Sequence, residues 1–386
     1  MAMRSRALLV SLVALACGAA CKPRGAPTEK GQGNAGSGGG TLRVHMEAEP
    51  PSLNPLVEHD AWTLWLTLGA VYDPLVREGK APGSFTPALA ASWDQPDDRT
   101  LHLVLRRDVT WHDGHPFTVD DVIGTFDRLR DPGVSPDARA DFDAVVSVEK
   151  KGEAEVVLKL GRPAPLLLQG LARLAILPAH LFGEGDLRKQ PASRAPVGTG
   201  PFRFVSWQAG QKLVFERAPR AWDRKAKIER LEVIVARDRE AAFELARRGA
   251  IDLLWQLTPS QVDRVAGDAA LAGYRVVPWH LRRYGFIVWN TARPGLGDRR
   301  VRRALSMLVD RKRYLDVAYR GRAVPVTGPY PLDADSYDKT IAPWPFDPAR
   351  ARALLDEAGV KDTDGDGLRD LLGAREPFRL AFLYNA

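Results

Sequence analysis

The segment Trp111–Val122 constrains the local structure of this chain more than any other stretch. It follows Arg99–Arg106, where leucines alternate with other residues and predict a strand. Asp113-Gly114, with a proline close behind, predicts a tight turn. Thr118 and Asp121 have the spacing of a capping box, which marks the start of a helix. The segment is therefore expected to lead the chain from a strand, through a turn, into a helix.

Strand and helix patterns alternate along the rest of the chain, which predicts an α/β fold. The expected strands are Thr41–Met46, Arg99–Arg106, Glu155–Leu160, Phe202–Trp207, Lys212–Arg217, Leu231–Val235, Ile251–Trp255, Tyr284–Asn290 and Phe378–Tyr384. The expected helices are Ala61–Val71, Glu240–Arg248, one after each of the N-caps Thr118, Thr258 and Asp298, and one from Asp347 to Gly359.

Composition narrows the possible functions. A chain of 386 residues is long enough for two or three domains. The formal net charge of +7 is mild, and no block of Lys and Arg occurs, so nucleic acid is not an expected partner. The only two cysteines, Cys17 and Cys21, lie near the N-terminus. The body of the chain therefore has no disulfide and no cysteine-ligated metal.

The N-terminus has the pattern of an export signal. Arg4 and Arg6 precede the apolar stretch Ala7–Ala16, which is too short to span a bilayer. Small residues then precede Cys17 and Cys21, as in a bacterial lipoprotein signal, and either cysteine is a candidate for lipidation. A plain secretory signal with incidental cysteines is the alternative. We expect a signal peptide over 1–20 and a flexible Gly-rich linker over 21–40, so that lipid chains hold the protein at a membrane.

Ten short segments occur in an order that resembles one protein family. They are Gly40–Val44, Glu49–Pro55, Tyr72–Val76, Pro87–Trp93, Trp111–Val122, Val197–Phe202, Gly249–Asp252, Trp289–Thr291, Val301–Leu305 and Ala353–Gly359. Together they are similar to the bacterial extracellular solute-binding proteins of family 5, which serve peptide-type ABC importers. Each segment is a weak signal alone, and their joint order makes the resemblance specific.

The resemblance implies an α/β fold of the periplasmic-binding-protein type, class II, with three sub-domains. Domain I is expected to be split between 41–81 and 198–278, with domain II at 82–197 between the two parts. Domain III is expected over 279–386. Family members continue well past a strand like Phe378–Tyr384, so domain III is expected to be incomplete and the chain truncated. The acidic residue that holds a peptide's amino end in the family lies beyond that point.

The implied function is capture of oligopeptides in the periplasm by hinged closure of two lobes, followed by delivery to an ABC permease and its ATPase subunits. The protein is then a lipid-anchored monomer that is not an enzyme and needs no cofactor. The open alternatives are the same fold binding a nickel chelate, haem, an opine or a sugar, and a non-functional truncated remnant. No Gly-x-Ser-x-Gly or His-Glu-x-x-His motif occurs, so no catalytic residue is expected.

Positions that match the family's cleft are the candidate ligand-binding residues. They are Glu58, His59, Asp60, Trp255, Gln256 and Tyr284. Aromatic rings supply rigid contact area, and an amide such as that of Gln256 pairs with a peptide group.

Two stretches of the sequence resemble metal-binding motifs. His112, Asp113 and His115 have the chemistry of a zinc or nickel site. The Asp-Gly turn favours a structural role for them instead, so no metal ligand is assigned. The acidic stretch Asp362–Asp370 follows the start of a calcium-loop pattern but has Gly373 where the pattern requires a glutamate. A solvated turn is the preferred interpretation, with calcium binding left open.

Overall fold

A computed structural model describes residues 39–81, 83–278, 284–334, 336–371 and 377–383. Cys17, Cys21, the expected signal peptide and most of the linker lie outside these ranges. The described residues form two compact units. Unit 1 runs to Leu257 and includes Asp268–Tyr274, and unit 2 comprises Thr258–Gly267 and the chain from Arg275 onward. The division into three sub-domains stays a prediction.

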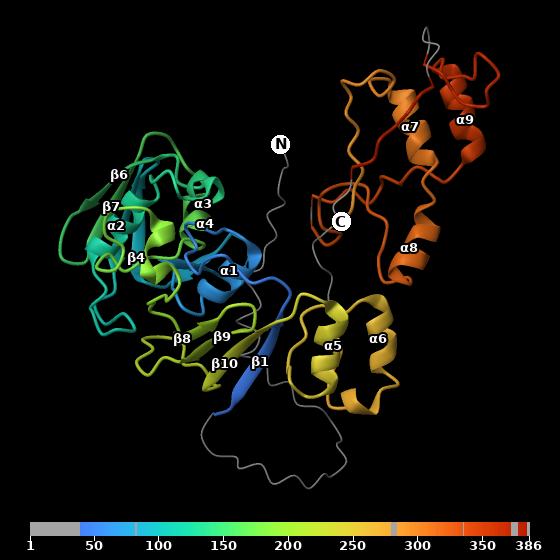
Figure 1. Ribbon diagram of the computed structural model, residues 1–386. Helices are drawn as coiled ribbons and strands as arrows, with labels where there is room; N and C mark the ends of the chain where they lie inside the picture. The colour runs from blue at the N-terminus through green and yellow to red at the C-terminus, as the bar shows by residue number, and fades with distance from the viewer. Residues whose placement is uncertain (1–38, 82, 279–283, 335, 372–376, 384–386) are drawn as a thin grey trace. The chain divides into compact units, whose positions relative to one another are not determined.

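Unit 1 contains two four-stranded sheets. The first sheet has the order β1-β10-β9-β8. Its strands are β1 (Thr41–Met46), β8 (Phe202–Gln208), β9 (Lys212–Arg217) and β10 (Arg230–Val235). β1 pairs in parallel with β10, with Val44 opposite Val233, and the other pairs are antiparallel. Segments from opposite ends of unit 1 thus build one sheet (Figure 1).

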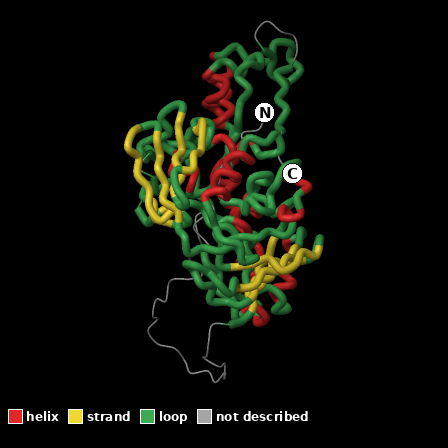
Figure 2. The backbone as a smooth tube through the Cα atoms, turned by 90° about the vertical axis from the view of Figure 1, so that its left-hand side faces the viewer, coloured by secondary structure: helices red, strands yellow, loops and turns green. Residues whose placement is uncertain are grey.

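The second sheet is antiparallel and has the order β4-β5-β7-β6. Its strands are β4 (Ala90–Asp97), β5 (Thr100–Leu105), β6 (Val145–Lys150) and β7 (Glu155–Leu160). A small pair, β2 (Val76–Glu78) and β3 (Phe85–Pro87), precedes it. Figure 2 shows the strands gathered in separate groups rather than in one continuous sheet.

Short helices connect the strands of unit 1. They are α1 (Ala61–Thr67), α2 (Val119–Arg128), α3 (Pro136–Ala140), α4 (Leu167–Leu171) and α5 (Arg239–Arg247), with 3₁₀ turns at Leu187–Lys189, Pro191–Ser193 and Ala269–Leu271. The capping box that starts α2 is confirmed, since the backbone N–H of Thr118 donates to Asp121 Oδ2 at 2.7 Å. The helix expected over Ala61–Val71 ends earlier, at Thr67.

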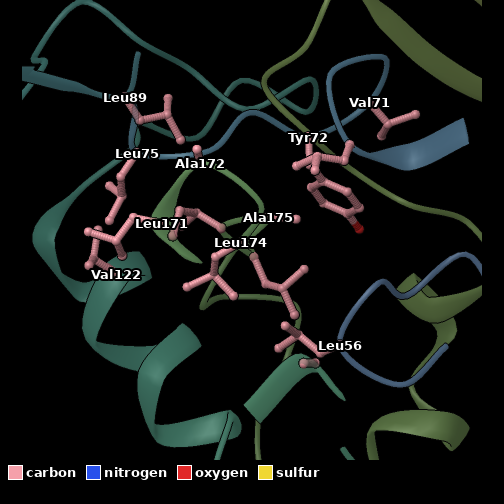
Figure 3. Packing of buried hydrophobic residues seen from close by; sticks show 14 of the residues in the cluster. Leu56, Val71, Tyr72, Leu75, Leu89, Val122, Leu171, Ala172, Leu174 and Ala175 are labelled. Carbon is pink, nitrogen blue, oxygen red and sulfur yellow. The ribbon is translucent and has the colours of Figure 1, made fainter. Parts of the chain in front are cut away.

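One apolar core runs through unit 1. Val122, Phe126 and Leu129 of the α2 face are all buried, as their spacing of four and three residues predicts. Figure 3 shows Val122 close to Leu171 of α4 and to Leu75, which precedes β2. Burial of this helical stripe stabilises α2 far more than helix propensity alone could.

Unit 2 has a smaller core. Its helices are α6 (Pro259–Val265), α7 (Arg299–Met307), α8 (Arg311–Tyr319) and α9 (Pro348–Glu357). The core joins α7 and α9, and consists of Leu296, Val301, Ala304, Met307, Ala351, Leu354, Leu355 and Val360. Asp298 and Asp347 cap α7 and α9 through backbone N–H groups, as the sequence predicts.

Three expected strands are wrong as written. Tyr284–Asn290 and the described part of the last strand, 378–383, are not part of any strand in the structure. Ile251–Trp255 is reduced to one parallel bridge, between Leu253 and Val44 of β1. The physical reason is the same in each case: alternating apolar residues favour an extended backbone, but a strand also needs a partner for its N–H and C=O groups. Trp289 and Phe382 still meet, with ring centroids 6.1 Å apart.

No helix in the described ranges is both long and apolar enough to cross a bilayer.

Candidate functional site

Three tryptophans form a cluster in unit 1 that we call the tryptophan cluster. Trp62 and Trp65 lie one turn apart on α1, and Trp255 comes from the segment after the Leu253 bridge. The ring centroids of Trp62 and Trp65 are 6.0 Å apart. The ring centroid of Trp255 lies 6.4 Å from that of Trp62 and 6.2 Å from that of Trp65. All three rings are partly exposed. Edge-to-face indoles of this kind offer a rigid apolar surface with polar N–H groups at its rim.

Two of the candidate ligand-binding residues, Glu58 and Asp60, are carboxylates that directly precede α1 in the sequence. Asp60 caps α1, accepting from the backbone N–H of Trp62 at 2.9 Å and of Thr63 at 3.1 Å. The structure therefore gives Asp60 a structural role that is independent of any ligand. Burial, and then the nearby negative charge of Asp60, raise the pKa of Glu58 above its usual value. Glu58 is thus an under-solvated carboxyl group that would gain from a hydrogen-bond donor on a ligand.

The remaining expected ligand-binding residues are placed differently. His59 is partly buried, with its Nδ1 3.4 Å from the carbonyl of Pro55. Gln256 is partly buried directly after Trp255. Tyr284 belongs to unit 2, is 39% exposed and packs against Phe286, with ring centroids 5.3 Å apart and planes tilted by 38°. Five of the six positions therefore share unit 1, and their role in binding stays a prediction.

His112 does not join Asp113 and His115. Its Nδ1 accepts from the backbone N–H of Gly198 at 3.2 Å, and its Nε2 donates to the carbonyl of Gly200 at 2.8 Å. The backbone N–H of His112 also donates to the carbonyl of Gly198 at 2.8 Å. The turn after Trp111 is thereby tied to the segment Val197–Phe202, so the structure uses His112 as a structural link.

Burial lowers the pKa of His112 below its usual value, because it disfavours the imidazolium form. The unfolded chain then binds the proton more readily than the folded one, so stability should fall as pH drops below about 6.5. This group should contribute a slope of up to about 1.4 kcal/mol per pH unit. His112→Gln should show a flatter dependence of urea midpoint between about pH 7 and pH 5. Parallel profiles for the two proteins would contradict this assignment.

Comparison with known proteins decides the family. The family model described as bacterial extracellular solute-binding proteins, family 5 middle, matches residues 84–386. The chain belongs to this family. It is a family of solute-binding proteins of transport systems rather than of enzymes, and its description places its members outside the cell.

Curated members of the family support the assignment. Di/tripeptide-binding protein 2 of Pseudomonas aeruginosa is 31% identical over 344 residues, covering 83% of this chain and 64% of that protein. Protein XP55 of Streptomyces lividans is 31% identical over 374 residues, covering 96% of this chain and 66% of that protein. The chain thus spans slightly less than two thirds of the length of these relatives.

Solved structures of family members confirm the α/β fold of the periplasmic-binding-protein type. The substrate-binding protein CtaP of Listeria monocytogenes matches with a TM-score of 0.73 at 29% identity, over 84% of this chain and 66% of that chain. The oligopeptide-binding protein AppA of Bacillus subtilis, solved with a nonapeptide, matches with a TM-score of 0.66 at 25% identity, over 88% and 68%.

Sequence reasoning missed Trp62 and Trp65 as members of the candidate site of this family-5 protein. The segment Ala61–Val71 was interpreted only as an apolar helix, without a role for either tryptophan. A usable signal was present, because two tryptophans three residues apart share one helix face, directly after the polar run Glu58–Asp60. Their proximity to Trp255, however, is a product of the fold.

The acidic loop of unit 2 is a turn held by its own side chains. Asp362 accepts from the backbone N–H of Gly365 at 2.7 Å and of Gly367 at 2.9 Å. Carboxylate oxygens of Asp362, Asp364 and Asp370 lie within 4.8 Å of one another. These hydrogen bonds account for a turn without an ion, and calcium binding remains the open alternative.

Proposed function

We propose that this chain is the substrate-binding component of a peptide-type ABC importer and that it captures oligopeptides. The observation that carries this proposal is the tryptophan cluster of a family-5 chain. In the sequence, Glu58 comes shortly before Trp62 and Gln256 directly follows Trp255. Relatives named as di/tripeptide-binding and structures titled as peptide complexes support the ligand class.

The proposed contacts follow from the chemistry of these groups. Indole rings bury apolar parts of a ligand at a low cost in side-chain entropy. The amide of Gln256 can both donate to and accept from a peptide group, and Glu58 accepts from a peptide N–H. Broad specificity follows, because these contacts address the peptide backbone and apolar area rather than one side chain. Tyr284 is kept as a candidate ligand-binding residue on the strength of the sequence resemblance alone.

Trp255→Ala should weaken peptide affinity by about 2 kcal/mol, or roughly 30-fold, because it removes an anchoring ring of the cluster. Gln256→Ala should weaken it by about 1 kcal/mol, the net value of one hydrogen bond. Isothermal titration of the full chain with peptides first selected from pools by thermal shift measures both effects, since a ligand specific for the folded state raises the melting midpoint.

A matched control is Trp93→Ala. Trp93 lies on β4, packed against the core and outside the tryptophan cluster, so this variant loses an equal ring. It should lose stability but keep its peptide affinity. Equal loss of affinity in both tryptophan variants would reject the site. A thermal shift with a nickel chelate, haem, an opine or a sugar, and none with any peptide, would reject the ligand class.

Further parts of the proposal concern how the carrier works. In this proposal the protein is exported, lipidated at Cys17 or Cys21, and acts as a monomer. It delivers its ligand to a permease with ATPase subunits and itself performs no catalysis. We propose the split domain I, domain II and domain III described above as the sub-domains of the carrier, and hinged closure of two lobes as its mode of capture. Mass spectrometry of the membrane-bound protein tests the lipid anchor, and unmodified N-terminal cysteines would refute it.

A further inference from the structure

A second cluster in unit 1 brings two imidazoles and one carboxylate together. Asp113 and His115 lie on the turn after Trp111, and His180 lies on the turn after Leu177. Asp113 Oδ2 is 2.7 Å from His180 Nε2, and Asp113 Oδ1 is 3.2 Å from His115 Nδ1. The two imidazole rings stack, with centroids 4.0 Å apart and planes at 27°. One nitrogen of each ring and one oxygen of the carboxylate all lie within 4.8 Å of one another.

From this geometry we propose that Asp113, His115 and His180 form a surface site for a divalent transition-metal ion such as Zn²⁺, Ni²⁺ or Cu²⁺. Two imidazoles and one carboxylate are a ligand set that these ions favour, and it leaves coordination positions open for water. His112 is not part of the site, since both of its ring nitrogens are used on Gly198 and Gly200.

The distances are close to those that coordination requires. With metal–ligand bonds of about 2.1 Å, neighbouring ligand atoms lie roughly 3.0–3.4 Å apart in octahedral or tetrahedral geometry. Of the two carboxylate–imidazole distances, that of 3.2 Å to His115 lies inside this range, and that of 2.7 Å to His180 lies slightly below it. The remaining adjustment falls mainly on His115, because its side chain is 60% exposed.

The turn at Gly114 orients Asp113, and the side chains of Asp113 and His180 are partly buried. Gly114 has φ +96°, which lets the turn reverse direction between Asp113 and His115. The backbone N–H of His115 donates to Asp113 Oδ1 at 3.2 Å, which orients the carboxylate. His180 and Asp113 are only 26% and 28% exposed. The site is therefore partly preorganised, although hydrogen bonds within the cluster also satisfy these groups when no ion is bound.

Cobalt is a suitable probe, because Co²⁺ reports its ligands by visible absorption. The full chain should be purified without a polyhistidine tag and with Cys17→Ser and Cys21→Ser, so that no thiolate competes. Excess Ca²⁺ should be present to occupy oxygen-only ligand sets such as the acidic loop. We expect saturable binding of one Co²⁺, displaced by Zn²⁺, and a rise in the melting midpoint with Zn²⁺.

His115→Gln and His180→Gln should each weaken binding at least about 10-fold, since losing a direct ligand costs no less than losing a supporting group. His102→Gln is the matched control. His102 also lies between two carboxylates, but Asp94 is near its Nδ1 and Glu155 is near its Nε2. The two carboxylates therefore do not point at one common position where an ion could bind. This variant should bind cobalt normally.

Three results would overturn the proposal: absence of saturable binding, unchanged affinity in His115→Gln, or an equal loss in His102→Gln. Because His115 is the most exposed ligand, its variant should fold normally and remains informative even if His180→Gln is unstable. None of these readouts depends on peptide binding, so the metal site and the proposed function are tested separately.

Discussion

Gly198→Ala should destabilise unit 1 by about 3 kcal/mol or more, the upper end of the cost of overpacking. A β-carbon at this position would lie 1.7 Å from the carbonyl oxygen of Val71. The obstacle is backbone, and it cannot rotate away as a side chain could. The same carbonyl accepts from the N–H of Gly200 at 2.8 Å, so any shift of the chain also breaks this hydrogen bond.

Urea unfolding of the purified variant measures the loss, and hydrogen exchange of a peptide covering 197–208 locates it. Gly183→Ala is the control, because nothing lies within 4 Å of a β-carbon there. That variant should stay within about 0.5 kcal/mol of the parent, as ordinary surface changes do. Equal midpoints for the two variants would show that the close approach at Gly198 is not required.

Asp73→Asn should cost about 3 kcal/mol, because it disrupts a buried carboxylate whose oxygens are fully used. Asp73 is 2% exposed. Its Oδ1 accepts from Arg77 at 2.9 Å and Arg224 at 3.1 Å, and its Oδ2 from Thr199 Oγ1 at 3.1 Å and Trp222 Nε1 at 3.0 Å. An amide NH₂ in place of Oδ1 would face two guanidinium donors, and in place of Oδ2 it would face the indole N–H of Trp222.

Asp223→Asn provides a sharp comparison, since Asp223 also pairs with Arg77, at 2.6 Å, but is 40% exposed. An exposed ion pair contributes less than about 1 kcal/mol, so this variant should unfold near the parent midpoint. Chemical denaturation of both variants at neutral pH separates the two cases. Similar losses would mean that burial does not govern the strength of these interactions.

The contacts of Gly198 and Asp73 show that sequence motifs from separate parts of the chain meet at one place in unit 1. Val197–Phe202 forms backbone hydrogen bonds with Ala70 and Val71. The carbonyl of Gly200 accepts a hydrogen bond from the ring of His112, and the hydroxyl of Thr199 donates one to Asp73. As sequence, the segments showed only that they occur in a characteristic order. The tertiary structure shows that they meet and that the glycines are needed for close approach.

Local patterns were the most reliable part of the sequence analysis. Glu155–Leu160 and Lys212–Arg217 coincide with β7 and β9, and the capping boxes at Thr118 and Thr258 start α2 and α6. Such signals depend on residues within one or two turns, so no distant contact is needed to interpret them. β4 was missed, because Ala90–Asp97 is polar, contains a proline and is mostly exposed.

Non-local features were not accessible in the same way. Trp62 and Trp255 are far apart in the chain, with ring centroids 6.4 Å apart in the structure. The bridge between Leu253 and Val44 of β1 brings the segment that carries Trp255 back to the first sheet. His115 and His180 are another such pair. The binding roles of Glu58, His59, Asp60, Trp255, Gln256 and Tyr284 remain predictions, although the capping bonds of Asp60 already give it a structural use.

By itself, the sequence determined the family, the α/β class and the start of most helices, because periodicity, capping residues and ordered short motifs are properties of neighbouring residues. Only the tertiary structure decided which side chains share a site, that His112 links two backbones while His115 meets His180, and which extended segments found a strand partner. The physical reason is that contacts between distant residues arise when the chain buries its apolar faces, and one-dimensional spacing does not specify that packing.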